Sequence, residues 1–496
     1  MYHHRRLSCL VIAILAGCLL FIIFGINTYT VTYHIQSTEE TYEKTYVMPF
    51  WQDEYSAEEP AMMGEANDVF SGWFYDEKLT KPVEAALVLK EDIQLYGDWI
   101  QDNPDTDFKL PEIHVTSKKA LEDIGKYAYE KCDYTITNTF ANNCLENVTG
   151  EIRGRGNSTW IEFDKKSYKI KFEEKQDLFQ MGEDKTWVLL SNSVDYTLMR
   201  NEIALGIGQI LDLDYTSECQ WVHLFYNGEY RGIYLLCEQV ETGIHRVDIE
   251  TPYDAEEIDT GFLLEIGGEL AGHTLSPVEN AERNWDDYAT FIISYPESDL
   301  ITKHQDEYMD AYLQLVNAAI LTKDWENIID LVDIESFAKW YLVNEIMLNG
   351  DMGWSMFAYK PQGDKMYLGP IWDFDQCCGN SVTGGEDYET WYPDAQSQNA
   401  WFNTLIEMEE FRNILGEIWD KNLPEIQEFI EKEKETAVFY RKDIDANFER
   451  WQVLGTAPWR IREEIGEFKT YQENADYLFE WLDNRIEWMN EQLSNP

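Results

Sequence analysis

The sequence predicts an α+β fold with two lobes, because strand patterns fill the first half of the chain and helix patterns fill the second. In Lys166–Phe172, apolar side chains alternate with lysines, which indicates a strand with one buried face. Trp221–Tyr226 and Tyr230–Cys237 flank Asn227-Gly228, a strong hairpin signal. We expect a small ligand to bind in the cleft between the two lobes.

The other elements follow from the same periodicities. A helix is expected to begin at Ser117 as its N-cap, with Leu121, Ile124 and Tyr127 on one side. A second helix should run from Asp195 to about Leu211. Further strands are predicted at 110–115, 186–190 and 261–266, with a short pair at 356–360 and 365–368. Further helices are predicted at 305–321, 334–348, 401–419, 424–441 and 471–493.

The composition indicates a folded, strongly acidic protein. Of its 496 residues, 44% are hydrophobic and 14% are aromatic, which is ample for a packed core. With 93 acidic against 39 basic residues, the formal net charge is −54. Such a surface repels phosphate backbones, so we expect no nucleic acid among its partners.

The N-terminus carries a targeting signal. Arg5 and Arg6 precede an uncharged apolar run, Leu7–Ile26, which as a helix of about 30 Å would span a bilayer. Because positive flanks stay inside, we expect a single-pass cell-membrane protein with its remaining residues outside the cytoplasm. Leu15-Ala16-Gly17-Cys18 also resembles a lipobox, so a lipoprotein anchored through Cys18 is the alternative, and a cleaved signal peptide is a third.

These patterns divide the chain into four segments. We predict an anchor at 1–27, an acidic stalk and N-terminal extension at 28–105, a strand-rich lobe at 106–250 and a helical lobe at 251–496. Outside the cytoplasm, Cys132 and Cys144 could form a disulfide across a short loop. The adjacent Cys377 and Cys378 lack the spacing of a zinc site.

Two acidic segments contain candidate catalytic and metal-binding residues. In Gly369–Asp375, Asp373 and Asp375 would share one face of an extended segment, and a few hard oxygen ligands suit Mg²⁺ or Mn²⁺ carrying phosphates. Either residue could instead cap a turn. Asp351 follows a predicted helix and is separated from Asp373 by the short strand pair. Kinase-type enzymes place a catalytic aspartate and a metal-binding aspartate on either side of such a hairpin.

A third candidate is a basic segment in the strand-rich lobe. Gly154 and Gly156 in Arg153–Trp160 allow close approach of the backbone to a ligand. Cations cluster around them, which on an acidic protein favours an anionic small ligand. These cations are Arg153, Arg155, Lys165, Lys166, Lys169 and Lys171.

Taken together, ordered motifs from about Leu110 to Asn380 resemble the CotH family of spore-coat kinases, and a weaker match continues to Arg485. The motifs are 155–160, 165–172, Arg200-Asn201, 228–234 with Glu238, and 372–375. The resemblance implies an atypical protein-kinase-like fold, with ATP and Mg²⁺ or Mn²⁺ as cofactors. It also implies transfer of phosphate to Ser or Thr of a surface or coat protein.

The resemblance assigns a role to each candidate residue. Asp351 would be the catalytic aspartate, Asp373 the metal ligand and Asp375 a second ligand. Lys171 is our choice for the lysine that meets the nucleotide, with Lys166 and Lys169 as alternatives. Glu202 is the candidate partner of that lysine. Glu238 and Glu265 are candidate structural partners of Arg155 or Arg200. The other candidate nucleotide-site residues are Gly154, Arg155, Gly156, Asn157 and Glu238 itself.

One position departs from the kinase pattern, which has a metal-binding asparagine five residues beyond the catalytic aspartate. Here that position is Met356, preceded by Ser355. Either Ser355 or Asp375 substitutes, or one metal suffices, or catalysis is impaired. Transfer of AMP instead of phosphate, and a non-catalytic coat or cell-surface scaffold, are the alternative functions.

Overall fold

The computed structural model describes residues 26–493 with internal gaps. The gaps are 37–39, 50–53, 56–67, 84–86, 102–107, 140–142, 253, 267–272, 276–277, 280–287, 290, 354, 383–386 and 393–399. The predicted anchor, apart from Ile26 and Asn27, and the lipobox Cys18 lie outside the described residues. Within the described residues, no helix combines the length and apolarity needed to cross a membrane.

The described residues fall into two compact units. The first is drawn from residues 1–109, 137–144 and 435–441, and the second from 110–136, 145–434 and 442–496. The boundary after Lys109 lies close to the one expected at residue 105. The predicted lobe boundary at 250 does not separate units, because the strands before it and the helices after it form one.

The first unit contains a three-stranded sheet within the segment for which the sequence predicted an acidic stalk and N-terminal extension. Strand β1 (Ile26–Ile35) pairs antiparallel with β2 (Glu40–Pro49) and parallel with β6 (Ile93–Gly97). From Tyr29 onward every second residue of β1 is large and apolar, and Val31, Tyr33 and Ile35 are buried. This alternation outweighs the acidity of the segment. The shorter strands are β3 (Glu54–Tyr55), β4 (Asp68–Phe70), β5 (Leu87–Val88) and β7 (Trp99–Gln101).

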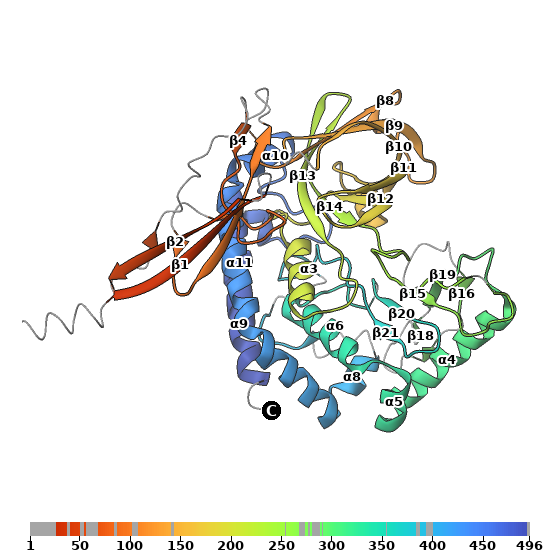
Figure 1. Ribbon diagram of the computed structural model, residues 1–496. Coiled ribbons are helices and arrows are strands. Elements are labelled where there is room, and N and C mark those ends of the chain that lie inside the picture. Colours follow the sequence, from red (N-terminus) through yellow and green to blue (C-terminus); the bar gives the residue numbers. More distant parts are fainter. Residues whose placement is uncertain are drawn as a thin grey trace, which may run out of the picture. The chain divides into compact units, whose positions relative to one another are not determined.

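The second unit begins with a closed seven-stranded barrel, shown in Figure 1 with strands from β8 to β14 around one core. Its order is β10-β11-β12-β14-β13-β8-β9, and β13 and β8 pair in parallel. Tyr134, Ile170, Phe172, Trp187 and Leu236 fill the interior. The strands are β8 (Glu112–Ser117), β9 (Glu130–Thr137), β10 (Leu145–Arg155), β11 (Ser167–Asp177), β12 (Glu183–Leu190), β13 (Cys219–Tyr226) and β14 (Glu229–Glu238).

Two predictions about the barrel region were wrong. The helix expected after Ser117 is only a 3-10 turn, η1 (Leu121–Asp123), and Tyr127 is 92% exposed. Ser117 is the last residue of β8, and its hydroxyl donates to the carbonyl of Lys131. Cys132 and Cys144 are free thiols. Cys132 faces the barrel core, whereas the Cys144 thiol donates to the carbonyl of Thr139.

The remainder of the second unit is mainly helical, as predicted. A five-stranded sheet, in the order β16-β19-β15-β20-β21, accompanies the helices. It consists of β15 (Phe262–Ile266), β16 (His273–Thr274), β19 (Phe291–Tyr295), β20 (Phe357–Lys360) and β21 (Tyr367–Leu368), and β17 (Val278–Glu279) pairs with β18 (Tyr288–Ala289). The helices are α2 (Ser158–Glu162), α3 (Arg200–Ile210), α4 (Lys303–Leu321), α5 (Trp325–Leu331), α6 (Ile334–Met347), α8 (Ala400–Leu405), α9 (Glu409–Phe439), α10 (Arg441–Arg450), η3 (Ile465–Glu467) and α11 (Tyr471–Leu493).

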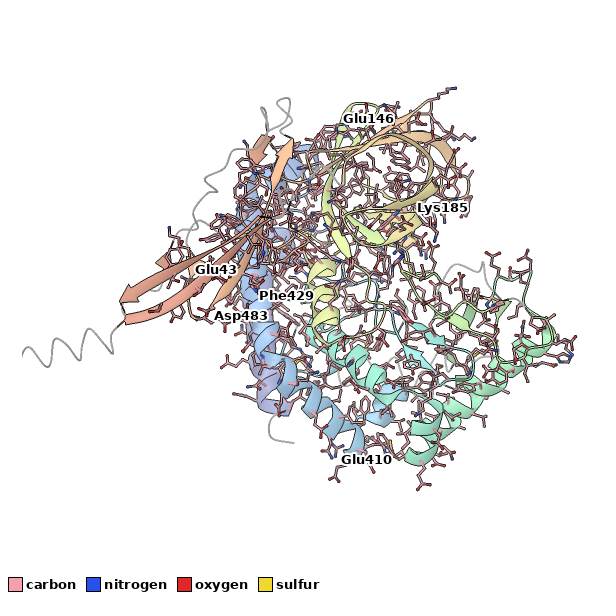
Figure 2. All side chains as sticks on the ribbon, in the orientation of Figure 1. Glu43, Glu146, Lys185, Glu410, Phe429 and Asp483 are labelled. Atoms are coloured by element: carbon pink, nitrogen blue, oxygen red, sulfur yellow. The ribbon has the colours of Figure 1, made fainter. Side chains whose placement is uncertain are left out.

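Helix α9 runs through Pro424, where the sequence suggested a break between two helices. Trp419 before the proline and Ile426 after it are both buried. Packing on both sides therefore outweighs the backbone hydrogen bond that proline cannot donate. Acidic side chains such as Glu43, Glu146, Glu410 and Asp483 are exposed on different elements, so the negative charge is dispersed (Figure 2).

Candidate active site

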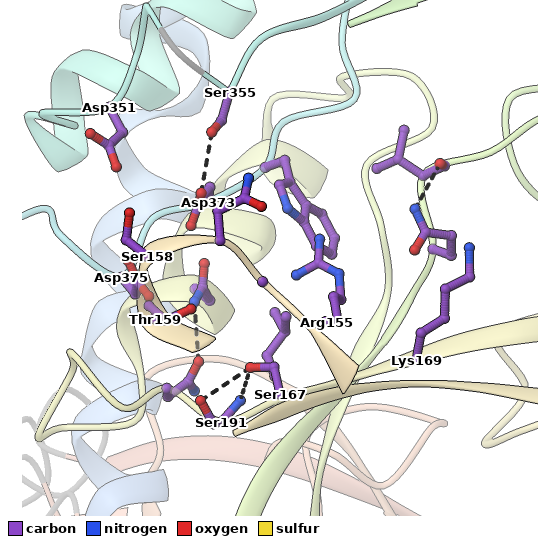
Figure 3. Close-up of a pocket in the computed structure, with 18 of the residues that line it drawn as sticks. Arg155, Ser158, Thr159, Ser167, Lys169, Ser191, Asp351, Ser355, Asp373 and Asp375 are labelled. Carbon is purple, nitrogen blue, oxygen red and sulfur yellow. Dashed lines mark hydrogen bonds between the residues drawn. The ribbon is translucent and has the colours of Figure 1, made fainter. Parts of the chain in front are cut away.

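A cavity of about 700 Å³ in the second unit brings most of the predicted site residues together. The ends of β10, β11 and β12 contribute to its lining, together with the segments that follow β14, α6 and β21. Figure 3 shows three aspartates together with Arg155, Lys169 and several hydroxyl side chains around it. The predicted residues that line it are Arg155, Gly156, Asn157, Lys169, Asp351, Asp373 and Asp375.

The turn after α6 positions Asp351. Leu348 ends the helix in the left-handed conformation, with φ +44°, and Asn349 follows. The Asn349 side chain accepts a hydrogen bond from the backbone N–H of Asp351 at 3.1 Å and donates one to the carbonyl of Asp373 at 3.3 Å. A single buried amide therefore fixes the two acidic segments that the sequence placed on either side of the β20–β21 hairpin.

The two carboxylates have different neighbours. Gln376 donates from Nε2 to Oδ2 of Asp351 at 2.6 Å, and Ser355 donates from Oγ to Oδ2 of Asp373 at 3.2 Å. Asp373 has φ +70°, and the next residue, Phe374, is held through its backbone N–H by Asn201 Oδ1 at 2.8 Å. The left-handed turn at Asp373 therefore has support from α3, the helix that carries Asn201.

Burial raises the pKa of each aspartate, and repulsion from neighbouring carboxylates adds to the effect at Asp351 and Asp375. Burial, and then the charge of Asp373, raise the pKa of Asp351 to about 6, which Arg460 opposes. Burial raises the pKa of Asp373, against the effects of Arg155 and the Ser355 hydroxyl. Burial and the neighbouring charges of Asp373 and Asp351 raise the pKa of Asp375. The surroundings of the site thus disfavour the charged form of all three carboxylates.

The chemistry of this donor set fits a divalent cation. Among the described residues, no group of three or more His, Cys, Asp or Glu side chains is placed to hold a metal. Mg²⁺ does not require such a group, because it commonly binds one or two carboxylates together with phosphates and water. Asp373 and Asp375, with Ser355 Oγ beside Asp373, are the side chains that would hold it.

Arg155 and Lys169 face the aspartates from the barrel. The Arg155 guanidinium lies 4.8 Å from the ring centroid of Trp372. Burial lowers its pKa, whereas Asp373 and Glu265 stabilise its charge. Burial also lowers the pKa of Lys169 to about 8, and its main stabilising neighbour is Glu241. An anionic ligand in the cavity would compensate both cations for the hydration energy that they lose by burial.

A sequence-family model described as CotH kinase protein matches residues 152–489, which is most of the chain. The chain belongs to the CotH kinase family. The match begins in β10 and ends in α11, so it includes nearly all of the cavity lining. No curated protein matches the chain. Membership of a kinase family assigns this CotH protein to the transferases.

The Gly-containing loop of the CotH protein closes one side of the cavity. Gly156 has φ +104°, a conformation that glycine adopts without strain, and the short helix α2 follows. Gly154 does not line the cavity. A Cβ atom there would lie 2.1 Å from the Trp160 ring, so Gly154 is needed for the close approach of that ring. Asn157 Oδ1 accepts a hydrogen bond from Lys126 Nζ at 3.2 Å.

Two of the three candidate lysines lie away from the cavity lining. Lys171 is exposed on β11, two residues beyond Lys169, so our choice of Lys171 has no support from its position. Lys166 donates to the carbonyl of Trp160. Lys165, which we counted among the cations of the segment, is buried and donates to Asn447 Oδ1 at 2.9 Å. The structure therefore favours Lys169.

Two of the three predicted glutamates, Glu202 and Glu238, differ from expectation. Glu202 lies on α3 and is not part of the cavity lining, whereas Glu241, beyond β14, is the carboxylate that affects Lys169 most. Glu238 forms an ion pair with Arg246, not with Arg155 or Arg200. Arg200 pairs instead with Asp195, and Glu265 lines the cavity near Arg155.

Met356, at the position of the missing asparagine, has a side chain only 1% exposed and is part of the core. Its neighbour Ser355 provides the polar group at the cavity. Sequence reasoning missed other lining residues, because no motif surrounds any of them. They are Lys126, Glu241, Gln376, Trp459 and Arg460.

Proposed function

We propose that this CotH protein is an extracytoplasmic atypical kinase with a kinase-like two-lobed fold. It transfers phosphate from ATP, with Mg²⁺ or Mn²⁺, to Ser or Thr of a surface or coat protein. The observation that carries the proposal is the convergence of Asp351, Asp373 and Asp375 with Arg155 and Lys169 in one cavity. Opposed groups of carboxylates and cations suit a metal–polyphosphate ligand.

The residues divide into binding and transfer roles. Arg155 and Lys169 meet phosphate oxygens, and the apolar side chains of Leu190, Val240 and Phe357 provide a wall against which a nucleobase packs. Asp373 and Asp375 hold the divalent cation, which neutralises charge on the phosphates. Asp351 orients the acceptor hydroxyl and takes its proton.

Location outside the cytoplasm rests on the apolar run Leu7–Ile26 and its preceding arginines. An enzyme in that position modifies proteins that are secreted, exposed on the surface or assembled into a coat. The dispersed acidic exterior keeps nucleic acids away. The protein acceptor and the nucleotide are therefore its partners.

The test is incubation of the purified protein with radiolabelled ATP and Mg²⁺ or Mn²⁺, with a casein-like acceptor, followed by intact-mass analysis. We expect each modified hydroxyl to gain a phosphate group. A gain of AMP would replace phosphate transfer by AMP transfer at the same site. Nucleotide binding without modification of any protein would favour the scaffold and contradict the proposal.

A further inference from the structure

Arg460 reaches the cavity from the segment that follows α10. Its own backbone is left-handed, with φ +56°. Two hydrogen bonds hold its carbonyl, one from Val382 N–H at 2.8 Å and one from Ser381 Oγ at 3.1 Å. The position of Arg460 is therefore fixed by packing against the segment just beyond Asp375.

The same contacts tie Arg460 to Asp351. Ser381 Oγ also lies 3.2 Å from Gln376 Oε1, and Gln376 Nε2 donates to Asp351 Oδ2. Nη1 of Arg460 then lies 4.0 Å from Asp351 Oδ1. That distance permits attraction but exceeds hydrogen-bond length. Asp351 is thus held by a hydrogen bond from Gln376 and accepts none from the Arg460 guanidinium.

The Arg460 guanidinium differs in its hydrogen bonding from two buried arginines of the second unit. Arg200 and Arg485 donate to carboxylates and carbonyls. Within the part of the chain that the structure describes, the Arg460 guanidinium donates no hydrogen bond, and its side chain is 43% exposed. It lies 4.9 Å from the ring centroid of Trp459, which restricts its orientation. Its donors are available to a ligand beside Asp351.

We propose that Arg460 binds the phosphoryl group while it passes from ATP to the acceptor, an assignment that rests on the proposed function. In that step the acceptor oxygen forms a bond to the γ-phosphorus. The bond from phosphorus to the bridging oxygen breaks, and its electron pair leaves on ADP. The hydroxyl proton goes to Asp351. Negative charge spreads over the three equatorial oxygens, where a guanidinium is most effective.

The position of Arg460 favours the moving phosphoryl group over the nucleotide itself. Asp351 marks the place of the acceptor hydroxyl, so a cation 4.0 Å from it lies at the acceptor end of the cavity. Arg155 and Lys169 come from the barrel, at the opposite side. Arg460 should therefore contribute little to ATP binding and much to the transfer step.

The test compares Arg460→Gln with Arg412→Gln, which changes an arginine on the outside of α9. We expect Arg460→Gln to lower kcat by roughly a hundredfold or more, the effect of removing one donor to a transition-state charge. The KM values for ATP and acceptor should change less than about threefold by the same argument. Arg412→Gln should match the wild type.

A binding measurement provides a second readout. ADP, Mg²⁺ and aluminium fluoride together mimic the phosphoryl group in transfer, and they should raise the wild-type Tm more than ADP and Mg²⁺ alone. Arg460→Gln should keep the ADP shift and lose the additional one. Because its guanidinium donates no hydrogen bond to the described protein, the variant should fold with an unchanged Tm when no ligand is added.

Two results would overturn the assignment and leave the proposed function intact. One is a kcat close to that of the wild type together with the full aluminium fluoride shift. The other is a raised acceptor KM at unchanged kcat, which would mean that Arg460 recognises an acidic group of the acceptor. A wild-type protein that neither binds nucleotide nor transfers phosphate would instead refute the proposed function, and this assignment with it.

Discussion

Asp351 and Asp373 are both partly buried carboxylates of one cavity, but their partners differ. Asp351 is hydrogen-bonded by Gln376 and lies near Arg460, whereas Asp373 is hydrogen-bonded by Ser355 and lies near Arg155. The first environment faces the acceptor in our proposal, and the second faces the phosphates and their cation. Single substitutions can therefore separate the two roles.

We expect Asp373→Asn to abolish metal-dependent nucleotide binding, because a neutral amide is a poor ligand for a hard dication. Asp351→Asn should bind nucleotide within about threefold of the wild type and lose transfer, since its role is exercised on the acceptor. Calorimetric titration with ATP and Mg²⁺ checks binding, and phosphate incorporation checks transfer. Equal loss of nucleotide binding in both variants would show that the roles are misassigned.

Lys165 makes stability depend on pH. Its ammonium group is buried, and burial lowers its pKa to about 7, well below the value of an unfolded lysine, about 10.4. Between these values the unfolded chain binds a proton that the folded chain lacks. The free energy of unfolding should therefore rise with pH, by up to about 1.4 kcal/mol per unit. The gain is absent below pH 7, where both states are protonated.

Urea denaturation at pH 7, 8 and 9 measures this slope. Lys165→Met should flatten it, even though the loss of hydrogen bonds to Asn447 and Ile233 also lowers stability at every pH. Lys171→Met is the matched control, because that lysine is exposed on the following strand and should leave the slope unchanged. Parallel curves for wild type and Lys165→Met would contradict the assignment.

At the scale of elements, β11 decides which lysine belongs to the site. Lys169 and Lys171 point to the same side of the strand, but they are about 7 Å apart along it. The pairing of β11 with β10 places Ser167 opposite Arg155, at the strand end that borders the cavity. Lys169 therefore lies next to the cavity, and Lys171 lies farther out in solvent.

Lys169→Met should weaken ATP binding by about 1–3 kcal/mol, or roughly 5- to 150-fold in Kd, the scale of a charge-assisted hydrogen bond. Lys171→Met removes the same charge from the same strand face and should change Kd less than about twofold, because its interaction is screened by water. Titration of both variants with ATP and Mg²⁺ decides between them. A larger effect of Lys171→Met would restore our first choice from the sequence.

At the scale of the whole molecule, membrane targeting is a prediction from the sequence alone. The run Leu7–Ile26 ends at the first residue of β1, and within the described residues no helix could span a membrane. We expect the full-length protein in the membrane fraction with its native N-terminus, and external protease should digest most of it on intact cells. Treatment of the same cells after lysis controls for protease access. A mature N-terminus at a lipidated Cys18 would establish the lipoprotein instead.

Several features of this protein could be predicted from local patterns alone. The alternation in β11, the Asn227-Gly228 turn between β13 and β14, and the periodicity of α4 and α6 were sufficient for those elements. The same holds for the candidate aspartates, since two acidic points flank a short hairpin. These signals are readable because each depends on residues within a few positions of one another.

Tertiary structure decided the rest. Closure of the barrel determined that Lys169, rather than Lys171, borders the cavity. It also placed Glu241 near that lysine, where the sequence suggested Glu202. Arg460 reaches Asp351 only because the segment after α10 packs against Ser381 and Val382. Lys169 and Lys171 are the same residue type and lie on the same side of one strand, although one borders a cavity and the other faces water. The difference arises from packing between distant segments, which local periodicity does not encode.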